Sequence, residues 1–421
     1  MPSGMLYDYP AMISPAINPA EFPILRQKVG SHSLIYFDSA ATTQKPQCVL
    51  DAIINYYTYN NSNVQRGAYR LSAEAERKVE QVREQVASFL HAGSSSEIVF
   101  TAGATAAINM VMASWGRTVV GPGDEVVVSM LEHHSNYLPW QELCKERGAT
   151  FRVIPINAHG DIDQVAYREM LSPKTKIVAL THLSNALGSL PPIEKMIAEA
   201  HRYGALTLVD AAQAVQHLPI DIQKLACDFL VLSSHKMYGP TGLGVLYGKQ
   251  EHFEKMVPYQ FGGGMAQYLG KQRHGSPASP HRFEAGTLHL AGITGLGAAI
   301  TFIEEVVGYQ KILAHDEQLM TYAINALQKV PGLKIVGNPQ KRLGILSFAI
   351  DGVHPLDIGL QLDMKGVAVR TGHHCATHLM DALGFEGTVR LSFAPFNSSQ
   401  EIDYLATLLQ TIATRRDGHK R

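Results

Sequence analysis

The stretch FLVLSSHKMYGPTGLG, from Phe229 to Gly244, lies at the centre of the chain's organisation. Its first four residues are apolar and predict a buried strand, and Leu243 to Tyr247 predict a second strand. Lys236 stands between them, next to a turn that is rich in glycine and proline. A single lysine in a loop is usually a solvated surface residue, because lysine is almost never fully buried. A buried amine, however, loses its proton readily and is suited to forming a Schiff base.

The neighbours of Lys236 favour the second interpretation. Ser233 and His235 can bind an anion beside the amine, and the glycines of the turn let the backbone approach a ligand closely. A Schiff-base amine next to an anion site is what pyridoxal phosphate (PLP) requires of a protein. The stretch therefore predicts the cofactor lysine of a PLP enzyme.

A carboxylate stands at the end of another predicted strand, Leu206 to Asp210. An aspartate aimed at the pyridine nitrogen of PLP keeps that nitrogen protonated, and the protonated ring is the electron sink of PLP chemistry. The ordinary role of an aspartate at such a position is to cap the following helix. Its combination with Lys236 favours the cofactor role for Asp210.

Four further residues that follow strands are weaker candidates for the same site. Gly103-Ala104-Thr105 stands where a strand becomes a helix, and backbone donors with the Thr105 hydroxyl can cradle a phosphate there. His133 can lie flat on a pyridine ring or carry a proton, although a buried core histidine is the commoner case. Asn185 can donate to the phenolate oxygen of the cofactor, and Gln213 lies one turn beyond Asp210.

Composition limits the class of protein. The chain has 421 residues, which is long enough for two or three domains, and a net charge of −1 gives no reason to expect nucleic acid or an anionic membrane as partner. No apolar run suggests a membrane span, and the first residues lack the pattern of a signal or transit peptide. The four cysteines are scattered and form no disulfide framework, so we expect the protein to lie in the reducing cytoplasm.

The order of the predicted elements indicates an α/β fold. Short apolar strands alternate with helices up to a Gly/Ser/Pro/His-rich break, Gly270 to Pro280, which predicts a long loop. This alternation is typical of a mostly parallel sheet covered by helices on both faces. Beyond the break, the pattern changes to a smaller α+β unit. We therefore expect a large PLP-binding domain over residues 34–292 and a small domain formed by residues 1–33 and 293–421.

A second cluster lies in the expected small domain, around Cys375 in Arg370-Thr-Gly-His-His-Cys375. A cysteine on such a turn can act as a nucleophile, and protonated His373 and His374 would favour its thiolate. The turn is expected to be exposed and mobile. The alternatives are an inert buried thiol or a zinc site, but adjacent histidines and a cysteine cannot easily converge on one ion, so no metal is expected.

Arg390 begins a later strand and offers a guanidinium fork for a substrate carboxylate. A structural arginine held in an ion pair is the equally ordinary alternative.

Several motifs together resemble the SUF-type (group II) cysteine desulfurases. These enzymes belong to the class V aminotransferase branch of the fold-type I PLP enzymes. The similarity runs from about Phe22 to the last helix. It is carried by SSHKMYGPTG at Ser233–Gly242, RFEAGT at Arg282–Thr287, EHHSN at Glu132–Asn136 and RTGHHC at Arg370–Cys375.

The resemblance implies a role for each candidate residue. Lys236 is the Schiff-base lysine, Asp210 pairs with the ring nitrogen, and His133 stacks on the ring. Asn185 and Gln213 touch the phenolate oxygen, while Thr105, Ser233 and His235 bind the phosphate. Thr287 reaches the phosphate of a neighbouring subunit, which implies a homodimer. Cys375 forms the persulfide, and Arg390 holds the cysteine carboxylate, with Asn185 beside it.

Two motifs depart from the family pattern. The usual Arg-Gly-Thr-Thr-Glu of the phosphate turn is Ala102-Gly-Ala-Thr-Ala106 here, which removes one hydroxyl and two charges, keeps the backbone donors and predicts weaker cofactor binding. Gln65 replaces the histidine of the usual Asn-x-His-Arg-Gly.

The expected activity is PLP-dependent conversion of L-cysteine to L-alanine, with transfer of the sulfur from Cys375 to an acceptor protein. The resemblance places this activity in iron-sulfur cluster assembly. Selenocysteine lyase, or another class V lyase such as a cysteine-sulfinate enzyme, is the alternative on the same fold. A non-catalytic scaffold with a decayed site is the alternative of a different class, and it would lack the yellow colour of bound PLP.

Overall fold

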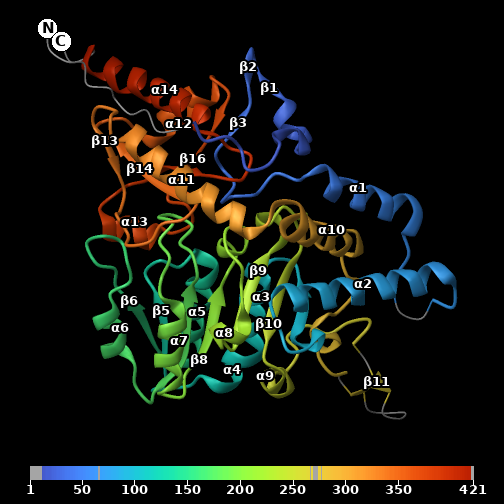
Figure 1. Ribbon diagram of the computed structural model, residues 1–421. Helices are drawn as coiled ribbons and strands as arrows, with labels where there is room; N and C mark the ends of the chain where they lie inside the picture. The colour runs from blue at the N-terminus through green and yellow to red at the C-terminus, as the bar shows by residue number, and fades with distance from the viewer. Residues whose placement is uncertain (1–11, 65–66, 266, 269–273, 276, 419–421) are drawn as a thin grey trace, which may run out of the picture.

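The structure is a computed structural model that describes residues 12–64, 67–265, 267–268, 274–275 and 277–418. Two sheets organise the fold, a large one in the lower half of Figure 1 and a small one at its upper left. Gln65 and residues 1–11 lie outside the described residues.

The large sheet has seven strands in the order β4-β10-β9-β8-β7-β5-β6. Only β10 runs antiparallel to its neighbours, β4 and β9, and the other adjacent pairs are parallel. The mostly parallel sheet expected from the sequence is therefore confirmed. The strands span Ile98–Thr101 (β4), Glu125–Ser129 (β5), Thr150–Ile154 (β6), Thr175–Thr181 (β7), Leu206–Asp210 (β8), Phe229–Ser233 (β9) and Gly244–Gly248 (β10).

Alternate side chains of these strands enter two different cores. In β5, Val127 belongs to one apolar cluster, and Val126 and Val128 belong to the other. Helices α2, α7 and α10 cover the first face, and α3, α5 and α9 cover the second. Burial on both faces explains why the strands are continuously apolar in the sequence.

The predicted alternation of strands and helices is present, since a helix follows each of β4, β5, β6, β7 and β8. The segment α10 continues as a π-helical turn to Val307, and Leu290–Val307 is the one described segment that is long and apolar enough to span a membrane. Within the fold, 67% of that window is buried, which is the condition of a core helix. The helices are α1 Gln47–Asn55, α2 Arg70–Phe89, α3 Ala104–Val111, α4 Arg117–Val119, α5 Leu138–Arg147, α6 Gln164–Met170, α7 Ile193–His201, α8 Ile222–Leu225, α9 Gln250–Lys255, α10 Leu290–Thr301, α11 Tyr309–Leu327, α12 Pro355–Asp363, α13 Thr377–Leu383 and α14 Ser399–Gly418.

The small sheet has four antiparallel strands in the order β13-β14-β17-β16. They span Leu333–Ile335 (β13), Ile345–Ile350 (β14), Arg370–Gly372 (β16) and Thr388–Ser392 (β17). Helices α11, α12 and α14 pack against them around a third apolar cluster. A capping box starts α14, since Ser398 N donates to Glu401 Oε2 at 2.9 Å and Glu401 N donates to Ser398 Oγ at 3.4 Å.

A segment near the N-terminus joins this small sheet region rather than the large sheet. The strand β3, Ile35–Tyr36, pairs in parallel with β15, Val367–Ala368, and Phe37 lies in the third apolar cluster. The division into domains at residues 34–292 stays a prediction. Of the predicted loop over residues 270–280, residues 270–273 and 276 lie outside the described ones, and β12 (His274–Gly275) pairs with β11 (Gln267–Tyr268).

Candidate active site

Lys236 lies where the buried strand β9 ends in a 3₁₀ turn, Ser234–Lys236, as the sequence predicts. Burial lowers the pKa of Lys236 to about 8, and the nearby Asp210 carboxylate opposes that shift. A fraction of the amine is therefore neutral near pH 7, which an amine needs in order to act as a nucleophile or base.

Asp210 is buried at the carboxyl end of β8, the neighbour of β9 in the sheet. Its Oδ1 accepts a hydrogen bond from Ala212 N at 2.9 Å, so the local cap expected for such an aspartate is present. Burial raises the pKa of Asp210, and the Lys236 amine lowers it. The carboxylate thus lies within electrostatic reach of the lysine, and its pairing with a ring nitrogen stays a prediction.

His133 follows β5 and is held by a local contact, since its Nδ1 accepts from Ser135 N at 3.0 Å. Burial and the positive charge of Lys236 lower the pKa of His133 to about 3, so the ring is neutral at pH 7. Because Nδ1 accepts, the proton of the neutral ring is assigned to Nε2. A flat, neutral ring is compatible with the predicted stacking role, which stays a prediction.

The predicted phosphate cradle is assembled from two separate junctions. Ser233 Oγ, at the end of β9, accepts from Ala104 N at 2.9 Å, at the start of α3. Thr105 Oγ1 lies 2.6 Å from Ser135 Oγ, which brings the cradle next to the His133 segment. A Cβ at Gly244 would lie 2.5 Å from Gly103 Cα, so only glycine there lets the two junctions approach.

His235 and Lys45 form the other wall near Lys236. The backbone oxygen of His235 accepts from Lys45 Nζ at 3.1 Å. Burial lowers the pKa of His235 to about 4, with Lys236 and Lys45 adding to the shift, so this ring is neutral too. Burial also lowers the pKa of Lys45 to about 8. Sequence reasoning missed Lys45, which lies in the turn that follows β3.

Thr287 is exposed and lines a cavity of about 330 Å³ together with Thr101, Ala102 and Ala106 of the phosphate turn. Ala102 and Ala106 leave that wall without the two charges of the usual family pattern. Whether Thr287 serves a neighbouring subunit stays a prediction.

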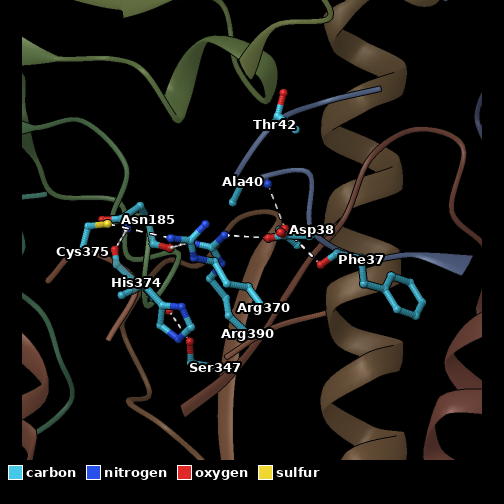
Figure 2. A network of polar contacts seen from close by, with 12 residues as sticks. Phe37, Asp38, Ala40, Thr42, Asn185, Ser347, Arg370, His374, Cys375 and Arg390 are labelled. Atoms are coloured by element: carbon cyan, nitrogen blue, oxygen red, sulfur yellow. Dashed lines mark hydrogen bonds and ion pairs between the residues drawn. The ribbon is translucent and has the colours of Figure 1, made fainter. Parts of the chain in front are cut away.

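Cys375 lies on a strained turn that is held at two carbonyls. His374 and Cys375 both have φ of 55°, a left-handed conformation that is costly for residues with a Cβ. His134 N donates to Cys375 O at 2.8 Å, and Asn185 Nδ2 donates to His374 O at 2.6 Å (Figure 2). The exposure expected of the turn holds only in part, since His373 is exposed, Cys375 is partly exposed and His374 is buried; its mobility stays a prediction.

His374 cannot supply the positive charge expected of it. Its side chain is buried, Nε2 lies 2.7 Å from Thr388 Oγ1, and burial lowers its pKa to about 2. Arg370 is a charged neighbour of the thiol, since its Nη2 lies 3.8 Å from Cys375 Sγ. Among the described residues, no group of three His, Cys, Asp or Glu side chains could hold a metal ion.

Arg390 lies on β17, between Asn185 and Asp38 in Figure 2. Its Nη1 donates to Asn185 O at 2.9 Å, and its Nη2 donates to Asp38 Oδ1 at 2.9 Å. The structure therefore shows the ion pair of the structural alternative, in a position next to the cysteine. Asp38 was missed from the sequence, where it is only the last residue of a predicted strand.

Gln213 and Asn185, expected at the phenolate oxygen, are each engaged with the protein. Gln213 Nε2 donates to Ala40 O at 2.7 Å, and Asn185 Nδ2 donates to the cysteine turn. An amide nitrogen carries two hydrogens, so each retains a donor for a ligand.

Glu132 is a further residue whose surroundings could not be deduced from its motif. It is fully buried and accepts from Thr181 N at 2.7 Å and Asn136 Nδ2 at 2.6 Å. Burial raises the pKa of Glu132 to about 8, and these hydrogen bonds oppose the shift. The residue ties the His133 segment to the end of β7.

The donors present fit PLP. A buried carboxylate faces the lysine, a flat neutral histidine lies nearby, and a glycine turn with two hydroxyls can receive a phosphate. The arrangement can bind an amino acid, remove a proton beside its amine, and present a thiol.

Comparisons with known proteins agree with this arrangement. Residues 35–405 match the family described as aminotransferase class-V. The probable cysteine desulfurase of Halalkalibacterium halodurans is 47% identical over 92% of this chain and 95% of that protein. The cysteine desulfurase of Synechococcus elongatus is 44% identical over 94% of this chain, which spans 63% of that protein's length. The solved apo structure of cysteine desulfurase from Thermococcus onnurineus has a TM-score of 0.89 at 35% identity, covering 94% of this chain and 97% of that one.

Proposed function

The chain belongs to the class-V aminotransferase family, and on that premise we propose that it is a cysteine desulfurase that uses PLP. The observation that carries the proposal is a thiol and a lysine at one site: the Cys375 sulfur is close enough to Lys236 for a thiolate to raise the pKa of the amine. A simple lyase needs the lysine but has no use for a thiol held there on a strained turn.

The residues that would hold PLP are Lys236, Asp210, His133, Asn185, Gln213, Thr105, Ser233 and His235, with Thr287 from a neighbouring subunit. When bound, PLP supplies an electron sink for the carbanion at the substrate Cα. The Ala102 and Ala106 positions make the phosphate depend more on backbone donors and on Ser233 and Thr105.

The chain's own groups divide the remaining work. Arg390 binds the substrate carboxylate, and the amine of Lys236 accepts the Cα proton, for which its lowered pKa suits it. The Cys375 thiolate attacks the substrate sulfur, so a sulfur–sulfur bond forms as the carbon–sulfur bond breaks. The electron pair of the broken bond stays on the substrate Cβ, which takes up a proton to become the methyl group of alanine. The products are alanine and a Cys375 persulfide. Arg370, at 3.8 Å from the sulfur, supplies positive charge to the thiolate.

The wider setting follows from the same resemblance. The persulfide sulfur passes to an acceptor protein for iron-sulfur cluster assembly, and the enzyme is a cytoplasmic homodimer that binds neither nucleic acid nor membrane. The exposed Thr287 in the cavity beside the phosphate turn supports the shared site, because a second subunit can reach that cavity from outside.

L-Selenocysteine is the second candidate substrate, because the lysine and arginine would hold it in the same way. The test is alanine formation by the PLP-loaded enzyme and by Cys375→Ser with each substrate. If Cys375→Ser loses activity with L-cysteine but keeps it with L-selenocysteine, the protein is a desulfurase that also accepts the selenium substrate. A serine variant as active as the parent on L-cysteine would overturn the proposal.

A further inference from the structure

Asp38 and Arg390 form a buried ion pair between segments that lie 352 residues apart, with Asp38 Oδ1 at 2.9 Å from Arg390 Nη2. The Arg390 side chain is 2% exposed and that of Asp38 is 22% exposed, so the guanidinium is almost fully removed from water. A charged pair removed from water to this degree is costly unless its geometry serves a purpose or is well supported.

The backbone around Asp38 is fixed to the strand that carries Arg390. Ser392 N donates to Phe37 O at 2.8 Å, and Ala40 N donates to Ser392 Oγ at 2.8 Å. Asp38 itself forms a parallel bridge with Ser392. The carboxylate therefore cannot swing far from the guanidinium, because both stand on one hydrogen-bonded frame.

The remaining donors of Arg390 show what the pair leaves free. A guanidinium has five N–H groups in a planar fork. One hydrogen of Nη1 goes to Asn185 O, one hydrogen of Nη2 goes to Asp38, and the buried Nε has no hydrogen-bond partner. Two anchors fix the plane of the fork while donors remain for a second carboxylate.

The positively charged side chains around the Asp38–Arg390 pair also favour the binding of an anion. Arg370 and Lys236 both lie close enough to Asp38 to favour its carboxylate, as Arg390 does, while Asp210 offsets the charge of Lys236. Asp38 offsets part of their mutual repulsion, and the excess positive charge suits an incoming carboxylate.

We propose that Asp38 is a positioning residue for substrate binding, which orients the Arg390 guanidinium so that its free donors meet the carboxylate of the amino acid. The inference rests on the proposed function of Arg390. Two alternatives predict the opposite sign: an Asp38 that the substrate must displace, or one that only neutralises charge, would each make carboxylate binding tighter when removed.

The test compares two ligands of the PLP-loaded enzyme that differ by one carboxylate, L-alanine and ethylamine. Their dissociation constants are read from the change in the cofactor's visible absorbance. Asp38→Asn is expected to raise the dissociation constant of L-alanine by about ten- to a hundred-fold, which corresponds to the loss of a charge-assisted hydrogen bond. The dissociation constant of ethylamine should stay within about twofold of the parent value. The KM for L-cysteine should rise with kcat little changed.

A second variant keeps the test decisive if Asp38→Asn does not load the cofactor. Ser392→Ala removes the hydrogen bond from Ala40 N that holds the turn after Asp38, without changing any charge. It should also lower the affinity for L-alanine, by a smaller factor than Asp38→Asn. Asp351→Asn, in an exposed pair with Lys334, is the matched control and should change nothing.

Tighter binding of L-alanine by Asp38→Asn or by Ser392→Ala would overturn the proposal. An equal loss of affinity for L-alanine and for ethylamine would overturn it too. A parent enzyme without preference for L-alanine over ethylamine would instead remove the role of Arg390. Alanine release from L-cysteine, measured separately, shows whether the proposed function itself fails.

Discussion

Asn185 Nδ2 donates to the carbonyl oxygen of His374 at 2.6 Å, which ties the end of β7 to the turn of the candidate nucleophile. The same residue accepts from Arg390 Nη1 through its backbone oxygen at 2.9 Å. Asn185 thus joins the candidate carboxylate site to the Cys375 turn. This contact helps to hold two consecutive residues at φ of 55°.

Asn185→Ala is expected to release the turn and expose the thiol. Losing one neutral hydrogen bond, worth about 0.5–1.5 kcal/mol, should raise the rate of Cys375 alkylation several-fold. Alkylation by iodoacetamide, followed by peptide mapping, measures the rate, and the exposed Cys48 serves as internal reference. An unchanged or slower rate at Cys375 would show that the His134 contact alone holds the turn.

Borohydride reduction of the yellow holoenzyme should place the pyridoxyl group on Lys236. The structure supplies a realistic competitor, because burial also lowers the pKa of Lys45 to about 8. Lys236 is favoured because Asp210 and the cradle at Ser233 lie around it. Peptide mapping decides between the two, with Lys236→Ala and Lys45→Ala as matched variants. A label on Lys45 in the parent protein would contradict the assignment.

Asp210→Asn should keep much of the cofactor and lose most turnover. The amide cannot stabilise a positive charge on a ring nitrogen, so the electron sink is weakened while the phosphate contacts remain. Alanine release and visible absorbance of the same preparation measure the two effects separately. Near-normal turnover would mean that another group holds the ring proton.

Much of this site could be predicted because its parts are local in sequence. Lys236 and Asp210 each follow a buried strand, and in a parallel sheet such ends meet on one edge. The cradle at Thr105 is visible for the same reason, as a glycine turn between a strand and a helix.

Other features depend on contacts that no local pattern encodes. Asp38 meets Arg390 because its segment forms a bridge with Ser392 of β17, and His374 is buried in hydrogen-bond contact with the distant Thr388. The sequence shows His373 and His374 side by side, which suggests that both rings carry a positive charge next to Cys375. Burial, which the neighbouring residues do not reveal, makes His374 neutral instead.

That burial predicts a pH dependence of stability. The pKa of His374 is depressed to about 2, below its ordinary value of 6.5, so the unfolded chain binds the proton more readily. Stability from the neutral ring is present above pH 6.5 and is lost as the pH falls towards the folded pKa. On going from pH 7 to pH 5, protonation linked to His374 should lower the free energy of unfolding by about 2 kcal/mol.

Urea unfolding of the parent and of His374→Asn at these two pH values measures the effect. The variant should lose less stability on acidification, even if it is less stable at pH 7. His354→Asn, at the exposed N-cap of α12, is the control, since asparagine also caps a helix. Equal acid losses in the parent and His374→Asn would show that this ring is not the source.

Cys375→Ser should bind cofactor and substrate normally and make little alanine from L-cysteine. The turn is anchored through backbone atoms of residues 374 and 375, and serine preserves those contacts, so the fold around Arg370 and Asn185 should persist. The hydroxyl is a far weaker nucleophile than a thiolate and cannot accept sulfur. Binding is read from the cofactor absorbance on adding L-alanine, turnover from alanine released by L-cysteine, and the persulfide from alkylation and peptide mapping. Normal binding with turnover reduced by orders of magnitude places the sulfur acceptor at Cys375. A persulfide found on Cys48 instead, with turnover retained in the serine variant, would move the nucleophile away from this site.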